Sequence, residues 1–348
     1  MTARGVLGAR PQPAIVRMPL TGVPIRRRSI LVTGVLALAA AALAVVALGL
    51  GDYPLSPGQV LAALGGDGGF ASTIVREWRL PRVLAALVFG GALAVSGAVF
   101  QSLTANPLGS PDVIGFSTGA YTGALVALTV LPAAYLSTAA GALLGGLATA
   151  VVVYALAYRG GVQGFRLIVI GIAVTAMLHA VNLFLLLRAQ AEVSMAASIW
   201  GAGSISLIGW PELLPACVAL ALTVPGFALI PALRQLELGD VAARAHGLCV
   251  EPARLGLVLF AVALVAIVTA STGPIAFVAL AAPQIAHRLV GGAGIPIVGS
   301  VFVGALVLLG ADVIAQHGVG TDVPVGMVTV VLGGCYLLAL LIREARHR

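Results

Sequence analysis

Long apolar runs, separated by short segments rich in glycine, proline and arginine, dominate the chain. A bilayer-spanning helix needs about 20 apolar residues, whereas a membrane strand has about 10 residues of alternating polarity. The runs here are long and unbroken, so they predict membrane-spanning helices. Gly273, Pro274 and Pro283 interrupt the eighth run, where a break is expected. The ten predicted spans are 30–50, 80–103, 113–131, 136–157, 167–187, 211–231, 254–272, 274–291, 295–315 and 324–342.

The composition requires lipid as the main solvent. Hydrophobic residues make up 60% of the 348 residues and charged residues only 9%, whereas a soluble domain carries about 25% charged residues. So few charges would not cover the surface of a soluble protein of this size. We therefore predict an all-α, polytopic membrane protein, with one transmembrane domain over residues 30–345.

Arginine positions give the expected orientation. Residues 1–29 carry six arginines and several prolines, and we expect them to form a disordered cytoplasmic tail. The run that follows is too long for a signal-peptide core, so we expect it to be retained as the first span. With ten spans and the N-terminus inside, 15 of the 19 arginines face the cytoplasm. Positive residues favour that side, which predicts two cytoplasmic termini in the cytoplasmic membrane.

Missing residue types exclude several functions. The chain has no lysine, so it has no nucleotide-binding P-loop, and any ATP-driven role needs ATP and Mg²⁺ bound by a separate ATPase. The net charge of +7 comes from arginines between apolar runs, which favours topology signals over nucleic-acid binding. No metal-type cysteine spacing or catalytic serine motif is present. We expect no enzyme activity, cofactor or metal.

Glycines recur at helical spacing within the spans. Gly119 and Gly123 form one such pair, Gly141 and Gly145 form another, and residues 90–97 are rich in small side chains. Lipid gives helices no hydrophobic reason to associate, so close backbone contact must hold them together. This pattern indicates a compact helix bundle.

Two polar segments lie next to the second predicted span. Arg79 and Arg82 flank Pro81 at its outer mouth, where they suit carboxylates of an external protein or, alternatively, lipid phosphates. At the other end, residues 106–112 contain two prolines and a glycine, so the helix must break. This break indicates either a constriction of a transport pathway or a simple cytoplasmic turn.

Two further regions carry polar residues. Residues 236–254 form the longest polar stretch between spans, which is either a docking site for a soluble partner or a solvated loop. Asp312 and His179 lie within apolar runs. Together they could form the proton relay of a stand-alone transporter, although a lone histidine more often bonds within the bundle.

Several long motifs resemble the iron-siderophore and vitamin B12 permeases, the ten-span subunits of type II ABC importers. The resemblance covers about residues 30–345. Its motifs are RLPRVLAALVFGGALAVSGAVFQSLTANPLGSPDVIGFSTGA (79–120), WGAGS (200–204) with Trp210, LGDVAARAHGL (238–248), STGPIAFVALAAPQIAHRLVG (271–291), Gly310–Asp312 and DVPVGMVT (322–329).

The resemblance implies two permease subunits around one pathway, two ATPase subunits on the cytoplasmic side, and a periplasmic or lipid-anchored binding protein outside. It also implies membrane lipid around the bundle. It assigns roles to three sets of residues. Binding-protein docking falls on Arg79, Arg82 and Gln316; the cytoplasmic gate on Asn106, Leu108, Gly164 and Phe165; and ATPase coupling on Leu238, Gly239, Asp240, Ala242, Ala243, His246 and Gly247.

Departures from the family pattern bear on the partner and the substrate. Gln316 stands where the B12 permease has a third docking arginine, which favours a heterodimer of two related permeases. The stretch from Asn106 to Val126 looks most like permeases for catecholate siderophores such as ferric enterobactin. We therefore expect a ferric siderophore permease. The alternatives are a vitamin B12 or haem permease and, in another class, a stand-alone proton-coupled transporter.

Overall fold

The structure is a computed structural model, and it describes residues 15–17, 24–66, 69–112, 114–130, 135–158, 164–292, 294–318 and 323–346. These residues are almost entirely helical, as the apolar runs predict. The helices are α1 (Arg27–Gly49), α2 (Pro57–Gly65), α3 (Phe70–Thr73), η1 (Ile74–Arg79), α4 (Leu80–Thr104), α5 (Phe116–Val130), α6 (Tyr135–Ala157), α7 (Gly164–Arg188), α8 (Ala191–Gly201), η2 (Pro211–Leu213), α9 (Leu214–Gly226), η3 (Phe227–Leu229), α10 (Ile230–Glu237), α11 (Asp240–Ala245), α12 (Val250–Thr272), α13 (Val278–Val290), α14 (Ile297–His317) and α15 (Val325–Arg346).

A short antiparallel ribbon precedes α1. Strand β1 (Ile15–Arg17) pairs with β2 (Pro24–Arg26), with Ile15 opposite Arg26. No strand is predicted from the apolar runs, and this ribbon lies before the first of them. Of the tail that we predicted to be disordered, residues 27–29 begin α1, and residues 1–14 and 18–23 lie outside the described residues.

Each of the ten predicted spans contains a helix, but the helices differ in length. Seven helical segments of the described chain are long and apolar enough to cross a membrane, and two shorter apolar helices are Phe116–Val130 and Val325–Leu340. Helix α13 has 13 residues and Pro283 inside it, so it is about 20 Å long and does not reach across a bilayer. The count of ten spans therefore stays a prediction, and the eighth run is only a partial span.

Helix α4 is the central element. It packs against α14, α13, α12 and α9, and most of its side chains are buried, including those of Phe89 and Phe100. Backbones approach closely at the predicted small residues: a Cβ on Gly90 would collide with the Gly304 carbonyl, and one on Gly123 with the Gly141 carbonyl. These contacts confirm the close helix packing expected from the glycine pattern.

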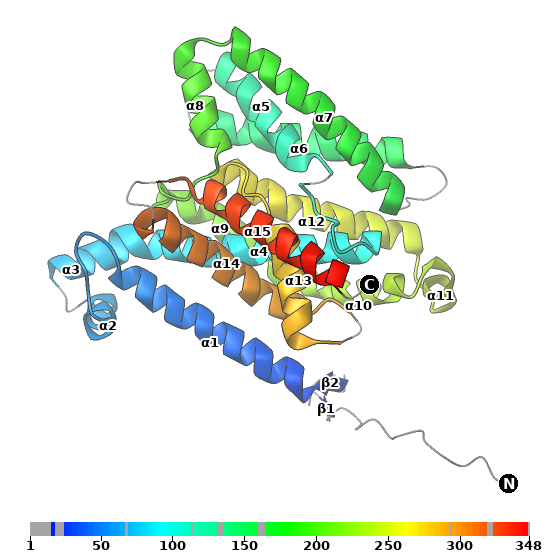
Figure 1. The fold of residues 1–348 in the computed structure, drawn as a ribbon, viewed down its shortest axis with the longest axis horizontal. Helices are drawn as coiled ribbons and strands as arrows, with labels where there is room; N and C mark the ends of the chain where they lie inside the picture. The colour runs from blue at the N-terminus through cyan, green and yellow to red at the C-terminus, as the bar shows by residue number, and fades with distance from the viewer. Residues whose placement is uncertain are drawn as a thin grey trace.

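Helices α5 to α8 form a separate layer beside this core (Figure 1). We call it the α5–α8 layer. Its tightest contact is between α5 and α6. Many of its outward side chains are aliphatic, such as Leu144 on α6 and Leu183 on α7. Such a surface fits contact with lipid or with another apolar protein face.

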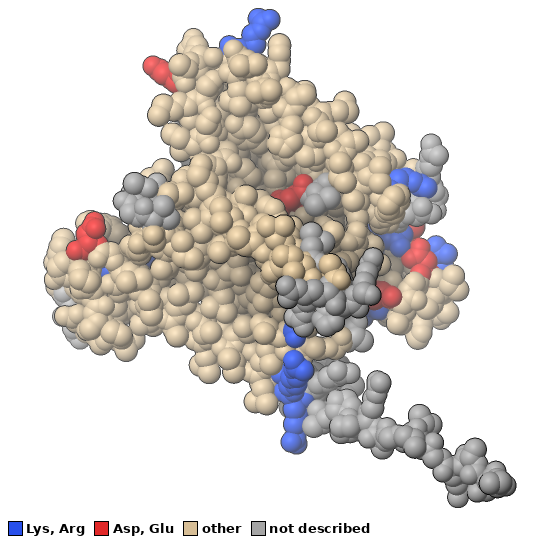
Figure 2. All heavy atoms as spheres, in the orientation of Figure 1, with Lys and Arg blue, Asp and Glu red and all other residues tan. Residues whose placement is uncertain are grey.

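The bundle has two distinct ends (Figure 1). One carries α2, α3 and η1, and the other carries α10 and α11; we call them the α2 end and the α11 end. The start of α1 and the end of α15 both lie toward the α11 end. Most visible charged side chains lie toward the two ends or at the top of the α5–α8 layer, and the face between shows little charge apart from one acidic group near its middle (Figure 2). This distribution is that of a protein whose middle is embedded in lipid.

Candidate functional site

At the α2 end, the predicted docking residue Arg79 ties two segments together. It lies where η1 passes into α4, and the Leu80 N–H bonds to the carbonyl of Val75, five residues back. The Arg79 guanidinium donates hydrogen bonds to the carbonyl of Leu48 at 2.8 Å and to that of Tyr53 at 2.9 Å. Arg79 therefore caps the last turn of α1, whose carbonyls lack helical partners.

The other two predicted docking residues meet at Asp312 on α14. Arg82 donates from Nε to Oδ2 at 3.0 Å and from Nη2 to Oδ1 at 2.7 Å, which is a bidentate pair. Gln316 donates to Asp312 Oδ2 at 2.7 Å, and Arg82 also donates to the hydroxyl of Ser206 at 3.2 Å. The Asp312 side chain is only 2% exposed. The carboxylate is thus satisfied inside the subunit.

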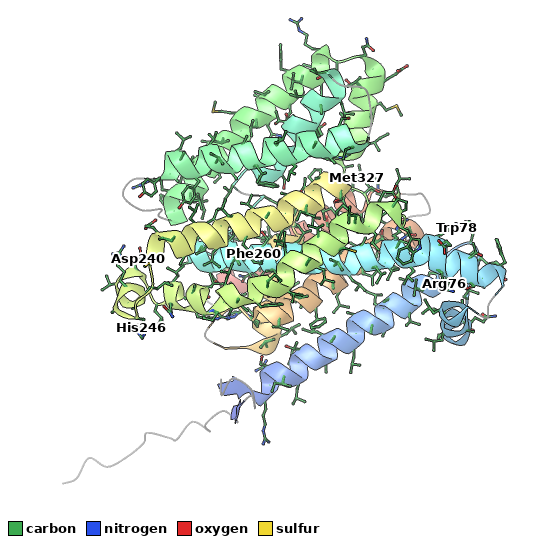
Figure 3. The ribbon with its side chains drawn as sticks, turned by 180° about the vertical axis from the view of Figure 1, so that it is seen from behind. Arg76, Trp78, Asp240, His246, Phe260 and Met327 are labelled. Carbon is green, nitrogen blue, oxygen red and sulfur yellow. The ribbon has the colours of Figure 1, made fainter. Side chains whose placement is uncertain are left out.

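A cavity of about 400 Å³ opens beside this cluster. Arg79, Arg82, Asp312 and Gln316 line it together with other residues of the α2 end. Arg76, three residues before Arg79, is exposed at the tip of this end, where Figure 3 labels it beside Trp78. The structure thus brings the predicted docking residues together but engages both arginines internally, and Arg76 is the exposed cation among the three.

The structure does not bring Asp312 and His179 together. Asp312 pairs with Arg82, whereas His179 on α7 lines a different cavity with Tyr121 of α5 and Met327 of α15. The two cavities have no lining residue in common. The geometry therefore gives no support to a relay between these two side chains.

The two predicted gate segments do meet, at the α11 end. The end of α4 turns away at Ala105, and the Asn106 side chain accepts the Leu108 N–H at 2.9 Å. Gly164, at the start of α7, lies so close to the Thr104 backbone that a Cβ would collide with it. The Leu108 and Phe165 side chains are exposed, at 48% and 80%. The predicted break in the helix over residues 106–112 is confirmed, while the gating role stays a prediction.

The predicted coupling segment forms a distinct helix, α11, on the surface (Figure 3). Gly239 and Gly247 flank it with φ angles of +94° and +84°, which glycine adopts readily. Ala243 is the buried residue of this helix, and the Asp240 carboxylate accepts a hydrogen bond from Arg254 of α12 at 2.6 Å. The other predicted coupling residues lie on or beside this helix: Leu238, Ala242 and His246.

A chain of polar contacts that was not predicted from the sequence links α4 to this end. The Ser102 hydroxyl on α4 donates to Glu237 on α10 at 2.7 Å, and Glu237 also pairs with Arg234 at 2.8 Å. Arg234 in turn donates to the Ile295 carbonyl just before α14. The gate-bearing helix is thus connected to the helix that precedes α11. The i,i+3 spacing of Arg234 and Glu237 was the one signal for this contact in the sequence.

Asp112 forms a second unpredicted cluster, in the middle of the bundle. The loop before α5, which contains Asp112, brings Gly115 against Thr175 of α7. Thr175 lies about 17 Å along α7 from its start. The Asp112 carboxylate accepts from the Ser117 hydroxyl and from the Phe277 backbone N–H. Its Oδ2 is buried with no hydrogen-bond partner among the described residues. The carboxylate therefore sits where α5 and α13 begin, a position that helix dipoles favour.

Phe277 has a backbone conformation that is rare for a bulky residue. Its φ is +69°, in the left-handed region, directly before α13. A Cβ on Gly333 of α15 would collide with the Phe277 side chain. The absence of a side chain at position 333 therefore makes room for the ring, and the junction holds together α5, α13 and α15.

No group of three or more metal-ligating side chains occurs among the described residues. The three cysteines, Cys217, Cys249 and Cys335, are all free and exposed. The features that the structure does show at the two ends are internal ion pairs, a close contact between the segments at Thr104 and Gly164, and an exposed surface helix.

Comparison with known proteins gives consistent matches over nearly the whole chain. The model of the FecCD transport family matches residues 36–343. The ferric enterobactin transport system permease protein FepG of Escherichia coli is 46% identical, over 92% of this chain and 98% of FepG. The achromobactin transport system permease protein CbrC of Dickeya dadantii is 37% identical, over 88% of this chain and 89% of CbrC.

A solved structure matches as well. It is an inward-facing conformation of a metal-chelate type ABC transporter, with a TM-score of 0.81 and 26% sequence identity, covering 90% of this chain and 99% of that one. The whole bundle therefore has the fold expected from the family resemblance.

Proposed function

Because the chain belongs to the FecCD transport family, we propose that it is the membrane-spanning permease subunit of an ABC importer for a ferric siderophore of the catecholate type. The 46% identity with the ferric enterobactin permease over almost the full length of both chains carries this proposal. The chain itself supplies the pathway and no nucleotide site, since it has no lysine for a P-loop.

The proposal assigns the two ends to different partners. The α11 end faces the cytoplasm and meets two ATPase subunits, and both termini lie on that side. The α2 end faces outward toward a periplasmic or lipid-anchored binding protein. The arginine distribution supports this orientation, because 15 of 19 arginines then lie inside. The exposed side chains of Leu238 and Val241 support a protein partner at α11.

Energy reaches the pathway through contacts that differ between the two states of the bundle. ATP binding by the partner moves α11, and α10 follows because only a short turn at Gly239 separates the two helices. The Ser102–Glu237 hydrogen bond then passes this displacement to the end of α4, beside the gate at Asn106 and Gly164. A partner shifts such an equilibrium only by binding one state better than the other.

A second, different permease completes the pathway in this proposal. Gln316 supports this, because it is bonded to Asp312 and offers no charge for docking. The relatives most like this chain in the catecholate stretch pair with a different subunit, as the family resemblance implies. The binding protein then makes its charged contacts with the partner permease and with Arg76 of this chain.

Uptake by whole cells tests the substrate. A strain that lacks its own catecholate permeases is given this chain with its neighbouring permease, ATPase and binding protein, and accumulation of ⁵⁵Fe from a catecholate chelate is measured. We expect unlabelled ferric catecholate to compete, and ferric hydroxamate, haem and vitamin B12 to compete poorly. Competition by haem or vitamin B12 instead would reassign the substrate. Transport by the chain alone in vesicles with a proton gradient would reassign the class.

A further inference from the structure

A cavity of about 510 Å³ lies where the α5–α8 layer meets the loop before α13 and the start of α15. Figure 3 labels Met327, one of its lining residues, in the space between this layer and the core. Thr118 and Tyr121 of α5, His179 of α7, Ser198 of α8 and Ala276 also line it. The cavity is thus built from four helices and one loop, well away from the cluster around Asp312.

Three side chains open to this cavity carry polar atoms that are not hydrogen-bonded to any other described residue. They are the hydroxyls of Thr118 and Tyr121 and the imidazole of His179, none of which is fully buried. Thr118 and Tyr121 are three residues apart on α5, so they share one face of that helix. Ser117 also lines the cavity, but its hydroxyl is already bonded to Asp112.

These polar groups stand out because the outward surface of α7 around His179 is mostly apolar. On α7, Met177, Leu183 and Leu187 are exposed within ten residues of His179. In hydrocarbon, a polar group without a partner is costly, and irregular backbone such as the loop before α13 survives only beside protein or a water-filled space. Lipid is therefore an unsuitable neighbour, and the cavity suits water or a polar ligand.

The Tyr121 ring forms part of the wall, and Trp200 supports it from outside the lining. The rings of Tyr121 and Trp200 are stacked, with centroids 6.2 Å apart and planes at 11°. No arginine lines the cavity, and the Asp112 carboxylate lies behind Ser117. A ligand here would meet hydrogen-bond donors and flat rings without a strong opposite charge, which favours brief contact over tight binding.

We infer that this cavity is a contact site for the cargo within the membrane, and that its ligand is an oxygen-rich, ring-bearing metal chelate of the ferric catecholate class. The phenolate and amide oxygens of such a chelate accept hydrogen bonds from Thr118, Tyr121 and His179. Its rings pack against the Tyr121 ring, which is stacked on Trp200. This inference rests on the proposed function and adds the residues that the cargo touches.

Cysteine labelling tests the site in the complete importer. The three native cysteines are replaced by serine, Thr118→Cys is introduced, and the assembled complex is treated with a negatively charged, water-soluble thiol reagent. We expect Thr118→Cys to react. We also expect ferric catecholate at about ten times its half-saturating concentration to slow the reaction about tenfold, because only about a tenth of the sites are then unoccupied. Val151→Cys is the matched control. The Val151 side chain is 64% exposed on the aliphatic surface of α6, so a cysteine there should face lipid and stay unreactive.

Uptake rates provide a second readout. Tyr121→Phe keeps the stacked ring and removes the hydroxyl, and His179→Ala removes the imidazole. We expect each to lower the maximal rate of catecholate uptake several-fold while the complex still assembles and hydrolyses ATP. Ferric catecholate should protect Thr118→Cys less well in either background.

The outcomes separate this inference from the proposed function. A parent complex that does not take up ferric catecholate overturns the proposed function, and this is measured first. A parent complex that transports the chelate while Thr118→Cys stays unreactive, because a second permease covers it, overturns the contact site alone. Reaction without protection by the chelate also overturns it.

Discussion

The residues predicted to bind partners are engaged inside the subunit at one end of the bundle and exposed at the other. At the α2 end, Arg79 and Arg82, which the sequence marks as outward-facing docking charges, bond to carbonyls and to Asp312 within the same subunit. At the α11 end, apolar side chains point outward: Leu238 is 66% exposed and Val241 is 82% exposed. The position of a charge in the sequence therefore says where it sits, but not whether it is free to bind a partner.

The physical reason lies in what each end must satisfy internally. Asp312 is a carboxylate within an apolar helix, where an unpaired charge is expensive, so Arg82 and Gln316 are drawn to it. Helix α11 has only six residues, and the buried Ala243 with the Asp240–Arg254 pair is enough to hold it. Its remaining side chains stay available, and an exposed apolar patch of this kind indicates a partner.

Removing the Asp312 carboxylate, which pairs with Arg82, should have the largest effect. Asp312→Ala leaves the guanidinium without its carboxylate partner at a site where the Arg82 side chain is 16% exposed. Breaking a buried ion pair from one side costs about 3–5 kcal/mol. We expect a marked fall in the melting temperature of the detergent-purified protein and in its yield.

The double variant Arg82→Leu, Asp312→Leu is the matched control. Replacing both charges by apolar groups is often neutral or stabilising, so most of the lost stability should return. A single variant as stable as the parent would show that the pair is not important. The same reasoning makes the charge reversal Arg79→Glu with Arg82→Glu a poor test of docking, because it would place a second carboxylate against that of Asp312.

The α11 end should respond in the opposite way, with loss of function and little loss of stability. Val241→Asp places a charge where we propose an apolar contact with the ATPase. Contacts of this kind cost about 2 kcal/mol or more when lost, which is about a 30-fold weakening of assembly. Co-purification of the ATPase and ATP-driven uptake measure it, while the melting temperature of the isolated subunit should not change.

Leu61→Asp on α2 is the control for this variant, because Leu61 is an exposed aliphatic residue, at 62%, at the opposite end. It should leave ATPase binding intact. Gly247→Asp tests the same contact less cleanly. Gly247 has a φ of +84°, so any side chain there also strains the backbone. Normal ATPase binding by Val241→Asp would refute the role of this helix.

The lengths of the apolar runs predicted the helices well because lipid leaves few alternatives. Unbroken apolar runs have to become helices, and the breaks at residues 106–112 and at Gly273–Pro274 follow from proline and glycine chemistry. The length of α13 was missed because hydropathy does not show where a chain re-enters the bundle. The apolar run begins before the first residue of α13. Phe277 redirects the chain there with a left-handed backbone conformation, which no composition rule predicts.

Pairing between distant side chains was the main gap. The partner of Asp312 lies 230 residues away on another helix, so no local pattern distinguishes Arg82 from His179 as that partner. Ser102 and Glu237, separated by 135 residues, were missed for the same reason. The two segments that the family resemblance assigns to the gate do lie close together, because Gly164 packs against the backbone of Thr104, two residues before Asn106.

Arg76 sharpens the comparison within the α2 end itself. It is the exposed arginine there, and we expect Arg76→Glu to weaken association with the binding protein by about tenfold at low salt without changing stability, because rim charges act mainly on encounter rates. Arg79→Ala should do the reverse and lower stability through the lost cap on α1. Binding kinetics at two salt concentrations separate the two; weaker docking by Arg79→Ala alone would reverse the assignment.

The smallest expected effect comes from the contact that joins gate and coupling helix. Ser102→Ala removes the hydroxyl bonded to Glu237, which keeps its pair with Arg234, so the stability loss should be about 1 kcal/mol or less. A coupling energy of that size changes an equilibrium about fivefold, so the number of ATP molecules hydrolysed per chelate imported should rise by no more than that. Ser102→Thr retains a hydroxyl and should behave like the parent. A lower melting temperature with an unchanged ATP-to-chelate ratio would show that this hydrogen bond only stabilises the α11 end and transmits nothing to the gate.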